Sequence, residues 1–167
     1  MLFKEGDLEF DFTNALNAEK FDEITYGGGM KQIDFIVELE DRYYFIEVKN
    51  PDNYIATQKA KNEFLNKVKN EKLKDDLIKK YKDSIIINWA DNKCNNKPVY
   101  YITILEASYI DNVLKIALMD SIKKGLPLKL NKEISLKHSI IEGFVIMSVE
   151  EWNKRFVNFP IRKLQIN

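Results

Sequence analysis

The sequence predicts an α/β domain, and three observations support this class. Two stretches of alternating side chains, 33–39 and 43–49, flank a short polar turn, as expected of two neighbouring strands. A long stretch with helical spacing follows over 54–82. Runs rich in β-branched and aromatic residues at 99–105 and 143–147 then supply further strands.

Length and composition indicate one globular domain over residues 1–167. A chain of 167 residues can bury a substantial core without disulfides or metals, and 45% of its residues are hydrophobic and 31% charged. The 26 basic and 26 acidic side chains cancel, so the molecule has no global positive field. A nucleic-acid partner would therefore have to bind a local basic surface.

Cysteine and histidine each occur once, which excludes several kinds of site. Cys94 alone cannot form an internal disulfide, and His138 alone cannot supply a multi-histidine zinc site. We expect His138 to be an ordinary surface or packing residue. The N-terminus lacks the apolar run of a signal peptide, and no stretch has the length needed to cross a bilayer. We therefore expect a cytoplasmic protein with no membrane partner.

The first thirty residues predict a strand, a short helix and a connector. Alternating apolar side chains indicate a strand at 8–12. Thr13 and Asn14 can then cap a helix that runs to about Phe21. The Gly27–Gly29 run lacks the Gly-Lys-Ser/Thr ending of a phosphate-binding loop, which favours a flexible connector over a direct role at a ligand.

The stretches 33–39 and 43–49 combine regular alternation with charged side chains. Because successive side chains on a strand point to opposite faces, Asp34 lies on the more polar face of the first stretch. Glu47 and Lys49 share one face of the second stretch. The apolar face of the first stretch comprises Ile33, Phe35, Val37 and Leu39.

The turn between these strands decides which charged residues face each other. The apolar faces of both strands belong against one core, and this requires a turn with an even number of residues. A turn at 41–42 puts Asp34 opposite Lys49, whereas a turn at 40–41 puts Asp34 opposite Glu47. In either register, two carboxylates and an amine gather on one surface.

Such a cluster suits metal-assisted hydrolysis of a phosphodiester bond. Asp34 and Glu47 offer the hard oxygen ligands that hold Mg²⁺, an ion that keeps several waters and also binds phosphate. The ion acidifies a bound water and neutralises charge on the phosphate, and Lys49 can orient that water and stabilise the same charge. On a solvated strand the same residues would form only a weak cross-strand ion pair.

At these residues the sequence resembles the PD-(D/E)XK nuclease superfamily, which includes many restriction enzymes, Holliday-junction resolvases and repair nucleases. The resemblance rests on Asp34 and on Glu47-Val48-Lys49 in the next strand, and it covers roughly residues 8–90. It implies a restriction-endonuclease-like core, a mixed β-sheet flanked by helices in the order αβββαβ. Residues 91–167 would extend this sheet and its helices.

The resemblance also implies roles for individual residues. Asp34 and Glu47 would bind Mg²⁺, with Mn²⁺ as a substitute, and the Val48 carbonyl would add a further ligand. Lys49 would serve the attacking water.

Three features of this region differ from the superfamily's pattern. Ile33 precedes Asp34 where proline is common, and only the short stretch 24–26 is left to form the preceding strand. Many members also carry an acidic residue on the first helix. Four residues compete for that place, and the sequence does not choose between them: Glu9, Glu19, Asp22 and Glu23.

The stretch from Tyr54 to about Lys82 predicts a helix that is kinked or divided near Asn70. Gln58, near its first turn, is a candidate contact to the nucleic-acid backbone. The stretch is the most basic part of the chain, and lysines beside a metal site would bind phosphates with a steep dependence on salt. The alternative is the solvated face of a helix. The lysines concerned are Lys59, Lys61, Lys67, Lys69, Lys72, Lys74, Lys79, Lys80 and Lys82.

The remaining elements look structural. The continuous apolar run Ser84–Trp89 predicts a buried central strand, and 99–105 predicts another. Asp111 can cap a helix that ends at Gly125. A last strand at 143–147 precedes residues 148–151, whose spacing is that of a capping box at the start of a short helix.

Taken together, these features predict a metal-dependent nuclease that cleaves nucleic acid, with DNA as the expected substrate. Two alternatives remain open. One is a domain of the same fold that binds nucleic acid or a protein without cleaving. The other is an unrelated α/β interaction domain whose strand charges are merely solvated. A nuclease that makes two cuts on a duplex would favour a homodimer.

Overall fold

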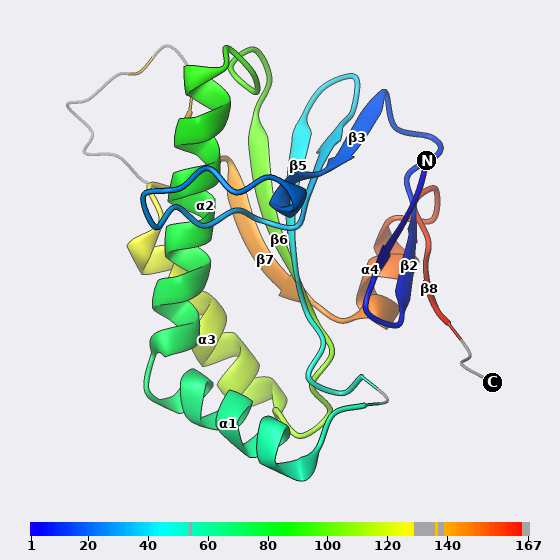
Figure 1. Ribbon diagram of the computed structural model, residues 1–167, viewed down its shortest axis with the longest axis vertical. Coiled ribbons are helices and arrows are strands. Elements are labelled where there is room, and N and C mark those ends of the chain that lie inside the picture. Colours follow the sequence, from blue (N-terminus) through cyan, green and yellow to red (C-terminus); the bar gives the residue numbers. More distant parts are fainter. Residues whose placement is uncertain (54, 129–135, 137–138, 165–167) are drawn as a thin grey trace.

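A five-stranded mixed sheet forms the centre of the computed structural model, which describes residues 1–53, 55–128, 136 and 139–164 (Figure 1). The sheet order is β3-β4-β5-β6-β7. β3, β4 and β5 pair antiparallel, whereas β5, β6 and β7 pair parallel. Its strands are β3 (Asn17–Lys20), β4 (Phe35–Glu38), β5 (Tyr43–Lys49), β6 (Val99–Leu105) and β7 (Gly143–Met147). The predicted α/β class and mixed sheet are confirmed.

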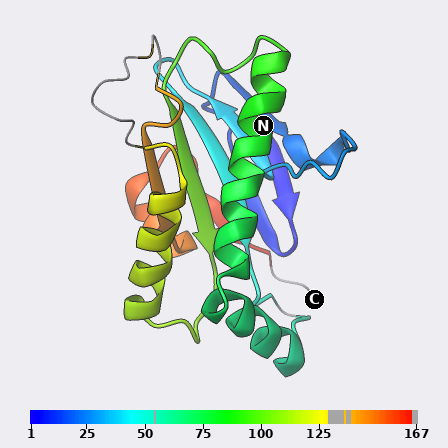
Figure 2. The ribbon, with the colours of Figure 1, turned by 90° about the vertical axis from the view of Figure 1, so that its left-hand side faces the viewer.

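Helices cover one face of this sheet (Figures 1 and 2). They are α1 (Gln58–Lys69), α2 (Lys72–Ala90) and α3 (Asn112–Gly125). Glu71, in the left-handed conformation at φ 63°, separates α1 from α2, so the predicted break near Asn70 is confirmed as a division. The predicted cap at Asp111 is also confirmed, since its carboxylate accepts the Leu114 backbone N–H at 2.8 Å.

The opposite face of the sheet packs against a second, smaller sheet and a short helix (Figure 1). These elements are β1 (Leu2–Glu5), β2 (Leu8–Asp11), β8 (Ile161–Lys163) and α4 (Val149–Arg155). The capping box at the start of α4 is confirmed: the Ser148 hydroxyl accepts the Glu151 N–H, and the Glu151 carboxylate accepts the Ser148 N–H. Phe10, Phe35 and Trp152 are fully buried in the apolar layer between the sheets.

The predicted strand at Ser84–Trp89 is wrong, because these residues form the last turns of α2. Three consecutive isoleucines suggest a strand, yet burial follows helical spacing across them. Ser84, Ile85, Ile87 and Asn88 are buried, whereas Ile86 and Trp89 are 53% and 41% exposed, so the buried positions recur at intervals of three and four residues. The two polar members of the run point inward: Ser84 and Asn88 are buried one turn apart, and the Asn88 amide donates to the Ser84 carbonyl. Their spacing continues the pattern of the preceding turns.

The predicted helix between Thr13 and Phe21 is also wrong. Residues 17–20 form β3, which pairs along the edge of β4 with Ala18 opposite Val37, and a 3₁₀ turn, η1 (Phe21–Glu23), follows. β3 also takes the place of the strand expected at 24–26. The capping residues gave only a local helix signal, and the ladder of hydrogen bonds to β4 outweighs it. The described chain therefore begins with strands rather than with a helix.

The turn between β4 and β5 is the one at 40–41. The Leu39 N–H donates to the Arg42 carbonyl at 2.9 Å, and Phe35 pairs with Ile46. Continued by one residue, this register places Asp34 opposite Glu47. Of the two registers that the alternation allowed, the structure adopts the one that brings the two carboxylates face to face.

Ile33 departs from the predicted alternation. It packs on the α2 side of the sheet, whereas Phe35 packs on the opposite side. β4 begins only at Phe35, and the Ile33 N–H donates to the Ser84 hydroxyl of α2 at 3.0 Å. The chain has therefore left the strand ladder by Ile33, and the period of two no longer applies there.

Three further sequence expectations concern single residues or the membrane. Cys94 is buried, and burial raises the pKa of its thiol to about 12, which does not suit a nucleophile at neutral pH. His138 lies outside the described residues. Among the helices that the structure describes, none has both the length and the apolar character needed to cross a membrane.

Candidate active site

Asp34 and Glu47 lie together on the face of the sheet that α2 covers. Both are buried, with exposed fractions of 5% and 0%. Asp34 stands at the entrance to β4, and its Oδ2 accepts the backbone N–H of Val48 at 2.6 Å. This bond fixes one carboxylate to the strand that carries the other. Their closeness therefore follows from the hairpin itself.

Two lysines donate to the Glu47 carboxylate from different elements. Lys80 of α2 places Nζ 2.7 Å from Oε1 and 2.9 Å from Oε2 of Glu47, and 3.4 Å from Oδ1 of Asp34. Lys49, two residues along β5, also donates to Oε1 of Glu47. Two ammonium groups thus face two carboxylates, and the cluster is formally neutral.

The Lys80 contact is the feature of the site that sequence reasoning missed, since Lys80 appeared there only among nine lysines of a basic stretch. A signal was present. Lys80 follows Leu77 by three residues and precedes Ser84 by four, and both are fully buried. A lysine at that spacing lies on the buried side of a helix. A lysine in such a position is expected to pair with a carboxylate, because buried lysines are rarely left without a partner of opposite charge.

Burial and charge act on these groups in opposite directions. Burial raises the pKa of Glu47 to about 7, the two lysines oppose that rise, and Asp34 adds to it. Burial lowers the pKa of Lys80, but Glu47 and Asp34 more than offset this, so the pKa of Lys80 lies above its usual value. Because both lysines donate to Glu47 oxygens, we take Glu47 as ionised above neutral pH.

Asp22, in η1, is the N-terminal acidic residue whose charge acts on this cluster. Partial burial raises the pKa of Asp22, and the charge of Asp34 raises it further, while Lys20 and Lys80 oppose the rise. Asp22 itself lies on the exposed surface of η1.

The other three acidic candidates lie elsewhere or make no recorded contact with the cluster. Glu9 lies in the smaller sheet, 3.9 Å from Arg162. Glu19, on β3, lines a separate cavity with Cys94. Glu23 is exposed next to Asp22.

Of the remaining residues predicted for the site, Val48 contacts Asp34 through its backbone N–H, whereas Gln58 and Gly27–Gly29 make no recorded contact with the carboxylates. The Val48 side chain is buried in the opposite apolar layer. Gln58 is exposed at the start of α1, where its amide donates to Asn62 at 3.1 Å. Gly27–Gly29 are exposed, all three at positive φ, with open space around them. Their conformation explains the glycines, and the connector interpretation stands.

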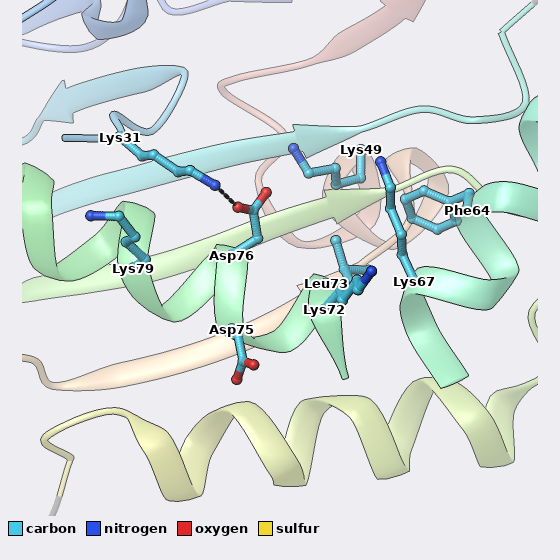
Figure 3. Close-up of a pocket in the computed structure, with 9 residues that line it drawn as sticks. All are labelled: Lys31, Lys49, Phe64, Lys67, Lys72, Leu73, Asp75, Asp76 and Lys79. Atoms are coloured by element: carbon cyan, nitrogen blue, oxygen red, sulfur yellow. Dashed lines mark hydrogen bonds and ion pairs between the residues drawn. The ribbon is translucent and has the colours of Figure 1, made fainter. Parts of the chain in front are cut away.

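A basic cavity of about 610 Å³ lies between α2, α1 and the end of β5 that carries Lys49 (Figure 3). Lys49 also contacts Glu47, which connects the cavity to the buried cluster. Lys31 pairs with Asp76 across the cavity, and Lys67 reaches from α1 toward the end of β5. The lining residues are Lys31, Lys49, Phe64, Lys67, Lys72, Leu73, Asp75, Asp76 and Lys79. Five lysines against two aspartates give the lining of this cavity an excess of positive charge.

The oxygen donors that a divalent ion could use here are few, the carboxylates of Asp34 and Glu47. In the part of the chain that the structure describes, no three His, Cys, Asp or Glu side chains are grouped to hold a metal. Mg²⁺ is often bound by only one or two carboxylates, together with waters and substrate phosphate. Between Asp34 and Glu47 the structure already holds a cation, the Lys80 ammonium. The buried Thr103 hydroxyl, on the β6 residue paired with Glu47, has no hydrogen-bond partner among the described residues.

Comparison of the chain with protein-family models, with curated proteins and with solved structures gives no significant match. The function must therefore be argued from the site itself.

Proposed function

We propose that this protein is a metal-dependent nuclease of the PD-(D/E)XK type, which hydrolyses phosphodiester bonds in nucleic acid, with DNA as its substrate. The observation that carries the proposal is the convergence of Asp34, Glu47 and Lys49 beside a cavity lined by five lysines. Stability alone does not account for a buried carboxylate pair, because burying the charges costs desolvation free energy. Apolar residues of similar volume often stabilise a protein as well or better.

The order of elements supports the same proposal. β3, β4 and β5 form an antiparallel meander, helices α1 and α2 follow, and β6 adds in parallel beside β5. This order agrees with the βββαβ part of the superfamily's arrangement. The leading helix of that arrangement has no counterpart in the described N-terminal residues, where β1, β2 and η1 stand instead.

Each residue of the site has a task in this proposal. Asp34 and Glu47, with the Val48 carbonyl, would hold Mg²⁺ or Mn²⁺, which supplies charge neutralisation on the phosphate and an acidified water. Lys49, held by its contact with Glu47, would orient the attacking water and stabilise the negative charge that develops on the phosphate. The lysines of the cavity would bind the neighbouring phosphates. The proposal keeps the cytoplasmic location expected from the sequence, and a homodimer wherever both strands of a duplex are cut.

One observation favours a second candidate, a domain of this fold that binds nucleic acid without cleaving it. Lys80 already neutralises the carboxylates, and the basic cavity needs no metal to attract phosphates. This candidate predicts that chelators do not affect the binding of nucleic acid. Lys49→Ala should weaken binding only slightly, because it removes one positive charge from the cavity.

The test is cleavage of duplex, single-stranded and branched DNA and of RNA, with Mg²⁺ or Mn²⁺, for the wild type and Lys49→Ala. Lys97→Ala is the matched control: Lys97 donates to Glu38 at 2.6 Å at the far end of the same hairpin and is similarly shielded. We expect chelator to abolish cleavage and Lys49→Ala to lower the rate by about 10²–10³-fold. Lys97→Ala should cut like the wild type.

The outcome separates the candidates. Metal-dependent cleavage that survives Lys49→Ala unchanged would place the chemistry elsewhere in the molecule. Binding without cleavage of any substrate, with or without metal, would leave the non-catalytic candidate.

A further inference from the structure

We infer that Lys80 is an internal cation that occupies the metal position and moves to a substrate phosphate when a divalent ion binds. The inference rests on the proposed nuclease function and adds a residue and a coupling to it. It assigns Lys80 a place in substrate binding, and it makes metal and phosphate bind cooperatively.

The Lys80 ammonium group lies between the two carboxylates. Lys80 Nζ lies within 3.4 Å of three carboxylate oxygens, two from Glu47 and one from Asp34. This single cation lies between the two carboxylates that would hold a divalent ion. The two cations cannot share the place, because like charges at such separations repel strongly in a poorly solvated site.

The charges of the cluster are balanced without a metal ion. Asp34 and Glu47 carry two negative charges, and Lys49 and Lys80 carry two positive ones. The cluster is neutral before a metal enters. A divalent ion would add two positive charges to a pocket that has no uncompensated negative charge left. Release of Lys80 restores part of the balance, and a phosphate restores the rest.

The basic cavity lies within reach of the Lys80 side chain. This side chain keeps 18% of its surface exposed, whereas the Glu47 side chain has none, so Lys80 lies at the margin of the buried cluster. Asp76, one helical turn before Lys80, and Lys79 beside it both line the basic cavity. The flexible four-carbon stem of a lysine can carry the amine toward that cavity by rotamer changes alone.

The consequence is a reciprocal coupling between metal and phosphate. Metal binding frees an amine for the phosphate, and phosphate binding holds that amine away from the carboxylates. By linkage each ligand must raise the affinity of the other by the same factor. Without nucleic acid, Lys80 suppresses binding of the metal.

Isothermal titration calorimetry tests this inference without relying on catalysis. Mn²⁺ is titrated into the wild type, Lys80→Met and the control Lys97→Met, alone and with a phosphorothioate single-stranded oligonucleotide. We expect Lys80→Met alone to bind Mn²⁺ between about 5-fold and 150-fold more tightly than the wild type, the usual range of such couplings. The oligonucleotide should tighten Mn²⁺ binding to the wild type and to Lys97→Met, and have little effect on Lys80→Met.

Lys80→Arg is a second control, because it changes the side chain but keeps its positive charge. It separates the effect of the lost charge from an effect of disturbed folding in Lys80→Met. Lys80→Arg should bind Mn²⁺ no more tightly than the wild type. Equal Mn²⁺ affinity of the wild type and Lys80→Met, both folded by circular dichroism, would overturn the inference while leaving the nuclease proposal intact. Tight binding by Lys80→Arg would overturn it as well. If the wild type cuts no substrate although Lys80→Met shows the expected gain in Mn²⁺ affinity, the nuclease proposal fails and the role of Lys80 stands.

Discussion

The two faces of the β4–β5 hairpin are both buried, yet they differ in kind. Toward the smaller sheet, Phe35, Ile46 and Val48 pack into an apolar layer with Phe10 and Trp152. Toward α2, the same strands carry apolar side chains at the turn end of the hairpin and Asp34 with Glu47 at the open end.

The difference shows how one hairpin can both stabilise the fold and carry the charged cluster. Alternation gives every second side chain to each face, so the apolar layer can stabilise the fold without any contribution from the site. The charged end of the other face can then hold groups whose burial is unfavourable. We expect changes on the apolar face to affect stability most, and changes on the α2 face to affect pH dependence and activity.

The largest effect on stability should come from Phe35→Ala. Phe35 is fully buried, with its ring centroid 4.9 Å from that of Phe10 and 5.9 Å from that of Phe12. Truncating a buried phenylalanine costs about 3–5 kcal/mol of unfolding free energy. Urea denaturation should show this loss, while Val113→Ala, at an exposed position of α3, should change stability little. A small loss for Phe35→Ala would mean that the apolar layer is not the main source of stability.

A smaller effect, confined to a pH window, should follow from Glu47→Gln. The pKa of Glu47 is about 7 in the folded protein against an ordinary value of 4.5, so between these values the folded state holds a proton that the unfolded state releases. Stability contributed by Glu47 therefore falls as pH rises from about 4.5 to 7 and changes no further above 7. Glu47→Gln lacks this decline.

Melting curves across this window measure the effect directly. The stability of Glu47→Gln relative to the wild type should increase from pH 4.5 to 7 by at most about 3 kcal/mol, since each pKa unit corresponds to about 1.4 kcal/mol. Parallel stability curves for the two proteins would show that the pair with Lys80 keeps Glu47 ionised throughout, and that burial is fully compensated.

The smallest effect should come from Ser84→Ala, which tests the contact between α2 and the start of β4. The Ser84 hydroxyl accepts the buried Ile33 N–H, which would lose its partner at a cost of about 1–2 kcal/mol. Because Asp34 follows Ile33, cleavage should also decline. Ser139→Ala, at an exposed serine, is the control. Equal denaturation midpoints for the two variants would show that Ile33 does not depend on this bond.

The sequence was sufficient for most of the elements and for three members of the buried cluster, Asp34, Glu47 and Lys49. Alternation restricted the hairpin to two registers, both of which bring Asp34 and Glu47 to one surface. It could not choose between them, because the turns at 40–41 and 41–42 satisfy the same parity. Packing of the whole strand against its neighbours makes that choice.

The errors arose where distant contacts decide local structure. Residues 17–20 form a strand because they pair with the edge of β4. The residues near 17–20 in the sequence carry no signal of this pairing. The run Ser84–Trp89 contains too few residues to distinguish a strand from a buried helical turn by periodicity alone. Lys80 meets Glu47 across 33 positions, and only the placement of α2 on the sheet reveals the pair.

Lys80 follows the hairpin in the sequence, so the ribosome adds it after both carboxylates. The two carboxylates are made before α2 exists, and a hairpin without that helix can keep Asp34 and Glu47 hydrated. Their burial becomes tolerable only when α2 docks and brings the amine. A chain interrupted before Lys80 would therefore retain its acidic pair at the surface, and the closed site exists only in a molecule that has completed this helix.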